Sequence, residues 1–163
     1  MKQILGFVIA LILLSTSGSN PVFAADFDTR AAQMHTVLTK YHSPMIGLEG
    51  VMIATAEKYG LDWTLLAAIA GTESSFGRRM PANCINPYGW GVYGSNKLCF
   101  ASFEAAIEGV ASGLSRKYNT TSLETIAKTY NKVSTAGWIS HTGYFMRKIK
   151  TAAIPVSALP VEL

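Results

Sequence analysis

One carboxylate, Glu73, lies at the end of an otherwise apolar helical stripe. Leu66, Ile69 and Ala70 recur at helical spacing, and the next position of this stripe, seven residues beyond Leu66, is Glu73. Burial disfavours the charged form of a carboxyl group and raises its pKa, so that it can donate a proton near neutral pH. Cleavage of a glycosidic bond needs such a donor, because an unprotonated sugar oxygen is a poor leaving group. The pattern therefore favours a general acid; the alternative is a carboxylate that bends into solvent or caps the next turn.

Aromatic and amide side chains follow Glu73 in a segment rich in Gly, Pro, Asn, Tyr and Trp, residues 77–100. Together with the residue just before it, this segment supplies Phe76, Tyr88, Trp90, Tyr93 and Phe100, interleaved with Asn83, Asn86, Ser95 and Asn96. Sugars present C–H faces and hydroxyl or acetamido groups, which such a surface matches. The same aromatics also suit a small core of the segment, and both roles can hold.

Three short motifs occur in the order found in a known group of proteins. Glu-Ser-Ser-Phe-Gly at residues 73–77 resembles the Glu-Ser motif of the lysozyme-like lytic transglycosylases and bacterial glucosaminidases. Asn-Pro-Tyr-Gly-Trp at residues 86–90 is similar to the Asn-x-aromatic-Gly signature of the glucosaminidase branch. Ile-Ala-Lys-Thr-Tyr-Asn at residues 126–131 resembles the Ala-Tyr-Asn segment of the transglycosylase branch. The Gly-Leu-Met-Gln stretch of the transglycosylases is missing, so no substrate contact is carried over there.

The resemblance covers about residues 59–149. It implies a mostly α fold, a lysozyme-like helical domain with a small irregular or β-hairpin lobe, and peptidoglycan glycan strands as the partner and substrate. It also implies that Glu73 is the catalytic acid, or acid and then base, that Tyr130 lies near it, and that Asn131 shapes the groove. The substrate-binding residues expected on these grounds are Ser74, Phe76, Asn86, Tyr88, Trp90, Tyr130 and Asn131.

A second catalytic carboxylate is not visible near Glu73. Hydrolysis by two carboxylates requires them about 5 to 9.5 Å apart. The sequence has no Asp or Glu between Glu73 and Glu104, and Glu104 and Glu108 lie on the side of their helix opposite its apolar face. Asp62 is better explained as a helix cap. A single-acid mechanism is therefore the simpler hypothesis; in the transglycosylases that the sequence resembles, the sugar's own 6-hydroxyl attacks and gives an anhydro product.

Other functions are kept as alternatives. They are an endo-β-N-acetylglucosaminidase, which hydrolyses the strand, and a non-catalytic cell-wall-binding protein on the same fold. A nucleophilic serine is disfavoured, because Ser74 and Ser75 lack the Gly-x-Ser-x-Gly turn. We expect no metal and no cofactor, since the three histidines are scattered without ligand spacing. Trp63 and Trp138 are expected to be core or groove-edge aromatics.

Six helices are predicted to position these residues. Apolar spacing predicts helices over residues 27–41 and 48–59, the second ending at Gly60, and a third that Asp62 caps and that runs toward Ser74. Ser102 is expected to cap a fourth helix. The residues Thr-Ser-Leu-Glu at 121–124 predict a capping box for a fifth that ends near Tyr130. A sixth is predicted over residues 140–153.

The amino terminus has the pattern of a secretory signal peptide. Lys2 precedes an apolar run over residues 4–14, and a polar stretch leads to Val-Phe-Ala at residues 22–24. As a helix the run would rise only about 16 Å against roughly 30 Å of bilayer hydrocarbon, so we expect no stable membrane insertion. We predict cleavage after Ala24, one domain over residues 25–154, a flexible tail over residues 155–163, and a periplasmic or secreted monomer. An uncleaved anchor is the alternative.

Charge and cysteine usage agree with export. The net charge of +4 is a modest basic excess that suits an anionic polymer such as a cell wall, although ordinary solubilising charge explains it equally. Export makes nucleic acid an improbable partner. Cys84 and Cys99 are the two cysteines of a chain bound for an oxidising compartment, which predicts a disulfide between them.

Overall fold

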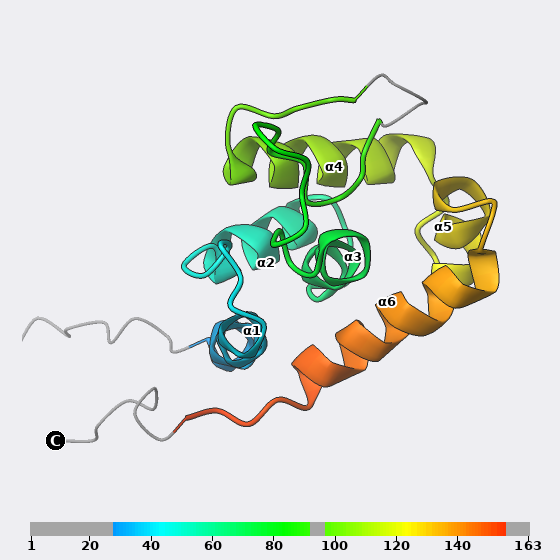
Figure 1. Ribbon diagram of the computed structural model, residues 1–163. Helices are drawn as coiled ribbons and strands as arrows, with labels where there is room; N and C mark the ends of the chain where they lie inside the picture. Colours follow the sequence, from blue (N-terminus) through cyan, green and yellow to red (C-terminus); the bar gives the residue numbers. More distant parts are fainter. Residues whose placement is uncertain (1–27, 92–96, 156–163) are drawn as a thin grey trace, which may run out of the picture.

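Helix α3 (Leu65–Ser74) lies at the centre of a helical domain. The computed structural model describes residues 28–91 and 97–155, and within these ranges the fold is mostly α, as predicted. The surrounding helices are α1 (Thr29–Lys40), α2 (Glu49–Lys58), α4 (Phe103–Lys117), α5 (Leu123–Tyr130) and α6 (Thr135–Lys150). Figure 1 shows α3 nearly end-on in the middle, with α4 above it and α6 running along its other side.

The central position of α3 follows from its composition. Every residue from Leu65 to Gly71 is buried, and a helix that is apolar on all sides is stable only when other elements cover it. Its most extensive packing is against α6. A Cβ atom at Gly71 would lie 2.7 Å from Phe76 Cζ and 3.0 Å from Phe145 Cδ2. The absence of a side chain there lets both rings pack directly on the helix.

The carboxyl end of α2 agrees with the prediction, and the amino end of α3 differs from it. Gly60 has a φ of +65° and directly precedes Leu61, whose N–H donates to Ala56 O, so the predicted left-handed end of α2 is confirmed. The predicted start of α3 is wrong by two residues. Asp62 Oδ1 accepts the Thr64 N–H at 2.9 Å. This bond stabilises a turn that precedes the helix, and Asp62 is therefore not the N-cap residue of α3.

The caps of α4 and α5 lie at serines. Ser102 accepts the Ala105 N–H and caps α4, as predicted. The capping box of α5 is shifted by one residue from the prediction, to Ser122 and Thr125. The reason is local, because the Thr121 hydroxyl donates to Asn119 Oδ1 at 2.6 Å and belongs to the preceding turn.

Helix α6 begins five residues before its predicted start and ends three residues before its predicted end. The Asn131 carbonyl accepts the Thr135 hydroxyl at 2.9 Å, and Asn131 Oδ1 accepts the Ser134 N–H at 2.9 Å, so the helix forms directly after α5. The early turns also bury Trp138, which is 2% exposed. Tertiary packing therefore extends the helix at its amino end.

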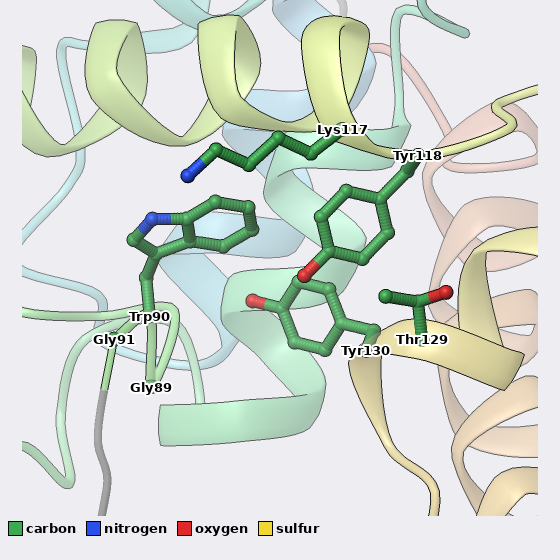
Figure 2. A pocket seen from close by; sticks show the side chains of 7 residues that line it. All are labelled: Gly89, Trp90, Gly91, Lys117, Tyr118, Thr129 and Tyr130. Carbon is green, nitrogen blue, oxygen red and sulfur yellow. The ribbon is translucent and has the colours of Figure 1, made fainter.

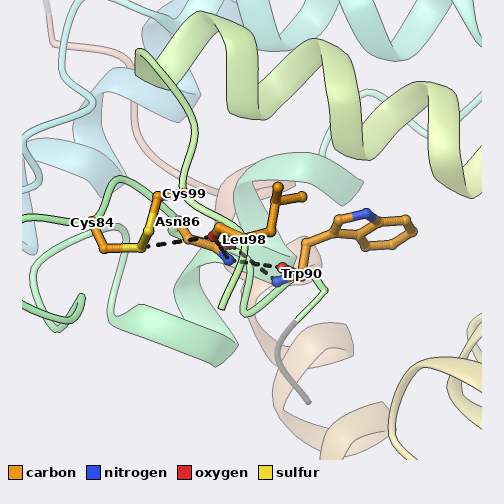
Figure 3. Close-up of a disulfide and its surroundings, with 5 residues drawn as sticks. All are labelled: Cys84, Asn86, Trp90, Leu98 and Cys99. Carbon is orange, nitrogen blue, oxygen red and sulfur yellow. Dashed lines mark hydrogen bonds between the residues drawn. A yellow bond between two sulfur atoms is a disulfide. The ribbon is translucent and has the colours of Figure 1, made fainter. Parts of the chain in front are cut away.

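The segment between α3 and α4 forms a lobe, which we define as residues 77–91 and 97–100. Its backbone pairing in the described part of the chain is a single antiparallel bridge between Ile85 and Phe100. The predicted disulfide between Cys84 and Cys99 is confirmed (Figure 3). The bond lies beside that bridge, because each cysteine directly precedes one of the two bridge residues.

None of the helices described here is long and apolar enough to cross a membrane. The predicted signal peptide, residues 1–24, lies outside the described residues, as does the tail beyond residue 155.

Candidate active site

The chain turns sharply directly after Glu73. Ser75, Phe76 and Gly77 have positive φ angles of 52°, 58° and 82°. The left-handed region costs a residue with a side chain about 1–2 kcal/mol. The Phe76 ring compensates, because it is fully buried and packs edge-on against Phe145 at 4.9 Å between centroids. This tight turn ends α3 and leaves Glu73 in the last helical turn, beside the lobe.

Two groups enclose the carboxyl group of Glu73. The indole Nε1–H of Trp138 donates to Oε1 at 2.8 Å. On the other side, the backbone at Gly89 approaches so closely that a Cβ atom there would lie 3.2 Å from Oε2. Gly89 also has a φ of +59°, which disfavours any other residue. No described residue donates a hydrogen bond to Oε2, so this oxygen is available to a ligand.

The pKa of Glu73 is raised above its ordinary value of 4.5 because the surrounding protein removes water from the carboxyl group. The hydrogen bond from Trp138 acts in the opposite direction, since it stabilises the carboxylate. Glu73 is nevertheless an exposed residue. Both solvent and a ligand can therefore reach its carboxyl group.

A Trp138→Phe variant is expected to raise the pKa of Glu73 further, because it removes the one hydrogen bond from a described residue that favours the carboxylate. A general acid acts in its protonated form, so the high-pH limb of the profile of kcat/KM against pH should move to higher pH. Looser orientation of the carboxyl group should also lower kcat by roughly tenfold to a hundredfold. Trp63→Phe is the matched control, since Trp63 packs on the core and precedes α3, whereas Glu73 lies in the last turn of that helix. If the high-pH limb of Trp138→Phe lies at the same pH as that of the wild type, the indole does not have the role assigned to it.

A pocket of about 300 Å³ borders Gly89 and is walled by aromatic rings. It is lined by Gly89, Trp90, Gly91, Lys117, Tyr118, Thr129 and Tyr130 (Figure 2). The rings form a continuous series, with centroid distances of 5.8 Å between Trp90 and Tyr130 and 5.0 Å between Tyr130 and Trp138. The pocket thus adjoins Glu73 through Gly89 and through the Trp138 indole.

The aromatic wall is held by close packing and one short hydrogen bond. The Tyr130 hydroxyl donates to the Tyr88 carbonyl at 2.6 Å, which ties α5 to the lobe. A Cβ atom at Gly113 would clash with the Trp90 indole, so this ring rests directly on the backbone of α4. Both contacts fix the rings before any ligand is present, which is the arrangement of a preformed binding site.

Four of the residues expected to bind substrate are buried in the structure. Phe76 and Tyr88 have no exposed surface, and Ser74 and Asn86 are 3% and 4% exposed. The Ser74 hydroxyl accepts the Gly77 N–H at 2.8 Å and lies 2.7 Å from the Pro87 carbonyl oxygen.

Asn86 holds the part of the lobe that lines the pocket. Its Nδ2 donates to the carbonyls of Trp90 and Leu98, both at 2.8 Å, and its Oδ1 accepts the Trp90 N–H at 3.0 Å (Figure 3). These three bonds fix the turn that presents Gly89 and Trp90. Trp90 and Tyr130 are the two predicted binding residues that line the pocket, and Asn131 instead holds the start of α6.

Five carboxylates of the described chain form ion pairs, and Glu73 is not one of them. They are Asp28 and Glu57 with Arg30, Glu49 with His35, Asp62 with Lys150, and Glu108 with Lys58. Within the described residues, the Glu73 carboxyl group accepts a hydrogen bond from Trp138 and forms none with another carboxyl group.

The described residues also contain no cluster of three or more histidine, cysteine, aspartate or glutamate side chains that could hold a metal ion. In comparisons with known proteins, the chain matches no protein-family model, and no curated protein matches it.

The pocket is also lined by Lys117, Tyr118 and Thr129, which were not predicted as site residues. Lys117 and Tyr118 belong to none of the three motifs, whereas Thr129 lies within the one at residues 126–131. They come from the ends of α4 and α5, which the fold brings to the lobe. Trp138 was expected only as a core or groove-edge residue. Its indole N–H requires a partner when buried, but the spacing of 65 residues does not identify Glu73 as that partner.

Proposed function

We propose that this protein cleaves peptidoglycan glycan strands between N-acetylmuramic acid and N-acetylglucosamine, as a lytic transglycosylase with Glu73 as its single acid and base. The observation that carries the proposal is the carboxyl group of Glu73. Burial raises its pKa, one of its oxygens is free, and it borders a pocket walled by aromatic rings. Aromatic faces beside a proton donor suit a saccharide whose glycosidic oxygen must be protonated.

The proposed reaction balances with one carboxyl group. Glu73 donates its proton to the glycosidic oxygen as the bond from the muramyl C1 breaks. The resulting carboxylate then takes the proton of the 6-hydroxyl of the same sugar while that oxygen bonds to C1. The product is a 1,6-anhydro sugar, and Glu73 regains its proton without consuming water. This scheme is supported by the sequence, which has no Asp or Glu between Glu73 and Glu104, so the lobe beside Glu73 supplies no second carboxylate.

Mass spectrometry of purified peptidoglycan digested in water enriched in heavy oxygen tests the reaction type. The expected products end in anhydromuramic acid, are lighter by one water than hydrolysis products, and carry no label. Labelled reducing ends on glucosamine would instead identify an endo-β-N-acetylglucosaminidase. Binding to cell walls without release of soluble fragments would identify a non-catalytic wall-binding protein.

A further inference from the structure

Lys117 is the charged residue of a pocket that is otherwise aromatic, glycine-rich or neutral. Among the described residues that line this pocket, none has an acidic side chain. In Figure 2 the Lys117 side chain extends from the end of α4 across the pocket toward Trp90. Within the described part of the chain, Lys117 forms neither an ion pair nor a hydrogen bond. Its ammonium group therefore offers three donors to a ligand.

The position of Lys117 at the end of α4 has a structural explanation that can be tested separately. Cations in the last turn of a helix interact favourably with its dipole, and Arg116 and Lys117 both occupy that turn. Arg116 donates to the Ser112 carbonyl at 3.3 Å and is not among the residues that line the pocket. Arg116 thus shares the helix-end role of Lys117 without sharing its position in the pocket.

The chemistry of the proposed substrate supplies a matching anion. In peptidoglycan every second sugar is a muramic acid, which bears a lactyl ether, whereas the alternate glucosamine is uncharged. The lactyl carboxyl group is free in strands stripped of peptide, and in intact strands it carries a peptide stem with carboxylates of its own. A substrate carboxylate would be repelled by an ionised Glu73 and attracted by Lys117.

Resting on the proposed function, we infer that Lys117 binds a carboxylate of the muramyl sugar, or of the peptide it carries. The pocket then accepts muramyl residues in preference to glucosamine. Lys117 is accordingly a specificity residue, which determines which of the two alternating sugars lies beside Glu73. The aromatic rings bind any sugar face, and the ammonium group distinguishes between the two sugars.

Calorimetric titration of soluble glycan fragments into the Glu73→Gln variant tests this binding without cleavage. Four fragments are compared: strands with peptide stems, strands stripped by an amidase, stripped strands with methyl-esterified carboxyl groups, and neutral N-acetylglucosamine oligomers. Added Lys117→Gln should weaken binding of carboxylated fragments by about fivefold, as for an exposed ion pair. The loss should shrink as salt is raised, and binding of the esterified and neutral fragments should be unchanged.

Control variants separate recognition from a structural effect. Lys117→Arg should retain the preference for carboxylated fragments, and Arg116→Gln should bind all four fragments like its parent. If Lys117→Gln loses affinity for the stripped strands alone, the lactyl carboxylate is the group that Lys117 binds. If it loses affinity for the intact strands alone, that group is a carboxylate of the peptide. Equal weakening for carboxylated and esterified fragments, or no weakening, would overturn the role of Lys117.

The proposed function is tested independently by cleavage with Glu73 intact. If fragments bind in a Lys117-dependent manner but are never cleaved, the catalytic proposal fails and the carboxylate site stands. If the strands are cleaved with the same KM by the wild type and by Lys117→Gln, the specificity proposal fails and the catalytic one stands. Absence of binding by all four fragments would contradict the carboxylate site directly.

Discussion

Replacing Glu73 by Gln is expected to lower peptidoglycan cleavage by about 10²–10⁴-fold while leaving the fold intact, the range that general acids contribute. A glutamine amide cannot donate an acidic proton to a leaving oxygen, but its Oε1 can still accept the Trp138 indole N–H that Glu73 Oε1 accepts. The measurement is the initial rate of release of soluble fragments, with circular dichroism to verify the helices. Glu104→Gln is the matched control, because Glu104 is an exposed residue in the first turn of α4. Wild-type rates in Glu73→Gln would remove this residue from the mechanism.

The same variant should be more stable than the wild type at neutral pH. The pKa of Glu73 is raised in the folded state, so the ionised carboxylate is less favourable there than in the unfolded chain. The wild type therefore loses stability as pH rises from about 4.5 through the folded pKa, and this cost remains at higher pH. Gln has no such cost. Thermal unfolding should show a higher Tm for Glu73→Gln at pH 7, by a small amount because the carboxyl group stays partly solvated, and no difference at low pH.

The turn directly after Glu73, which we propose as the acid, is held by the surrounding core. Ser75 and Phe76 occupy left-handed backbone conformations directly after Glu73, and the buried Phe76 ring compensates for this strain. The site is therefore maintained by the core around α3, in which Phe76 packs. This coupling explains why α3 combines an almost wholly buried helix with a carboxylate in its last turn.

Local sequence signals were sufficient for much of the helical framework. Helix α4 was predictable because its apolar residues recur at helical spacing and Ser102 caps it, and both features act within a few residues of the chain. The end of α2 at Gly60 was predictable for the same reason. Where two neighbouring hydroxyl residues compete, as Thr121 and Ser122 do, the sequence does not decide which one caps the helix.

The site itself was only partly predictable, because its contacts join residues far apart in the sequence. The position of Glu73 on an apolar stripe is a local pattern, so this residue was identified. The partner of each polar atom is determined by packing between elements, as in the bond from Trp138 to Glu73 or from Tyr130 to the Tyr88 carbonyl. For the same reason, composition could not show that Tyr88 is buried within the core while Trp90 lines the pocket.

Replacing both cysteines of the lobe by serine is expected to lower the free energy of unfolding by about 3 kcal/mol, the chain-entropy value for a loop of this size. The bond joins Cys84 and Cys99, which are 15 residues apart, and they are the two cysteines of the chain. Denaturant unfolding followed by circular dichroism measures the change. Wild type with a reductant should match the double variant, and the reductant should leave the variant unchanged. An equal unfolding midpoint with and without the bond would contradict this contribution.

The loss of stability in the double variant should be concentrated in the lobe, because few other bonds hold the lobe together. The helices keep their backbone hydrogen bonds and the core around α3, whereas the lobe has the Ile85–Phe100 bridge and the side-chain bonds of Asn86. The lobe also presents Gly89 and Trp90 to the pocket. In the double variant, cleavage activity should therefore disappear at a lower denaturant concentration than the helical signal does. In the wild type the two losses should coincide, because the disulfide holds the lobe in the form in which Tyr88 bonds to Tyr130 and Trp90 packs on α4.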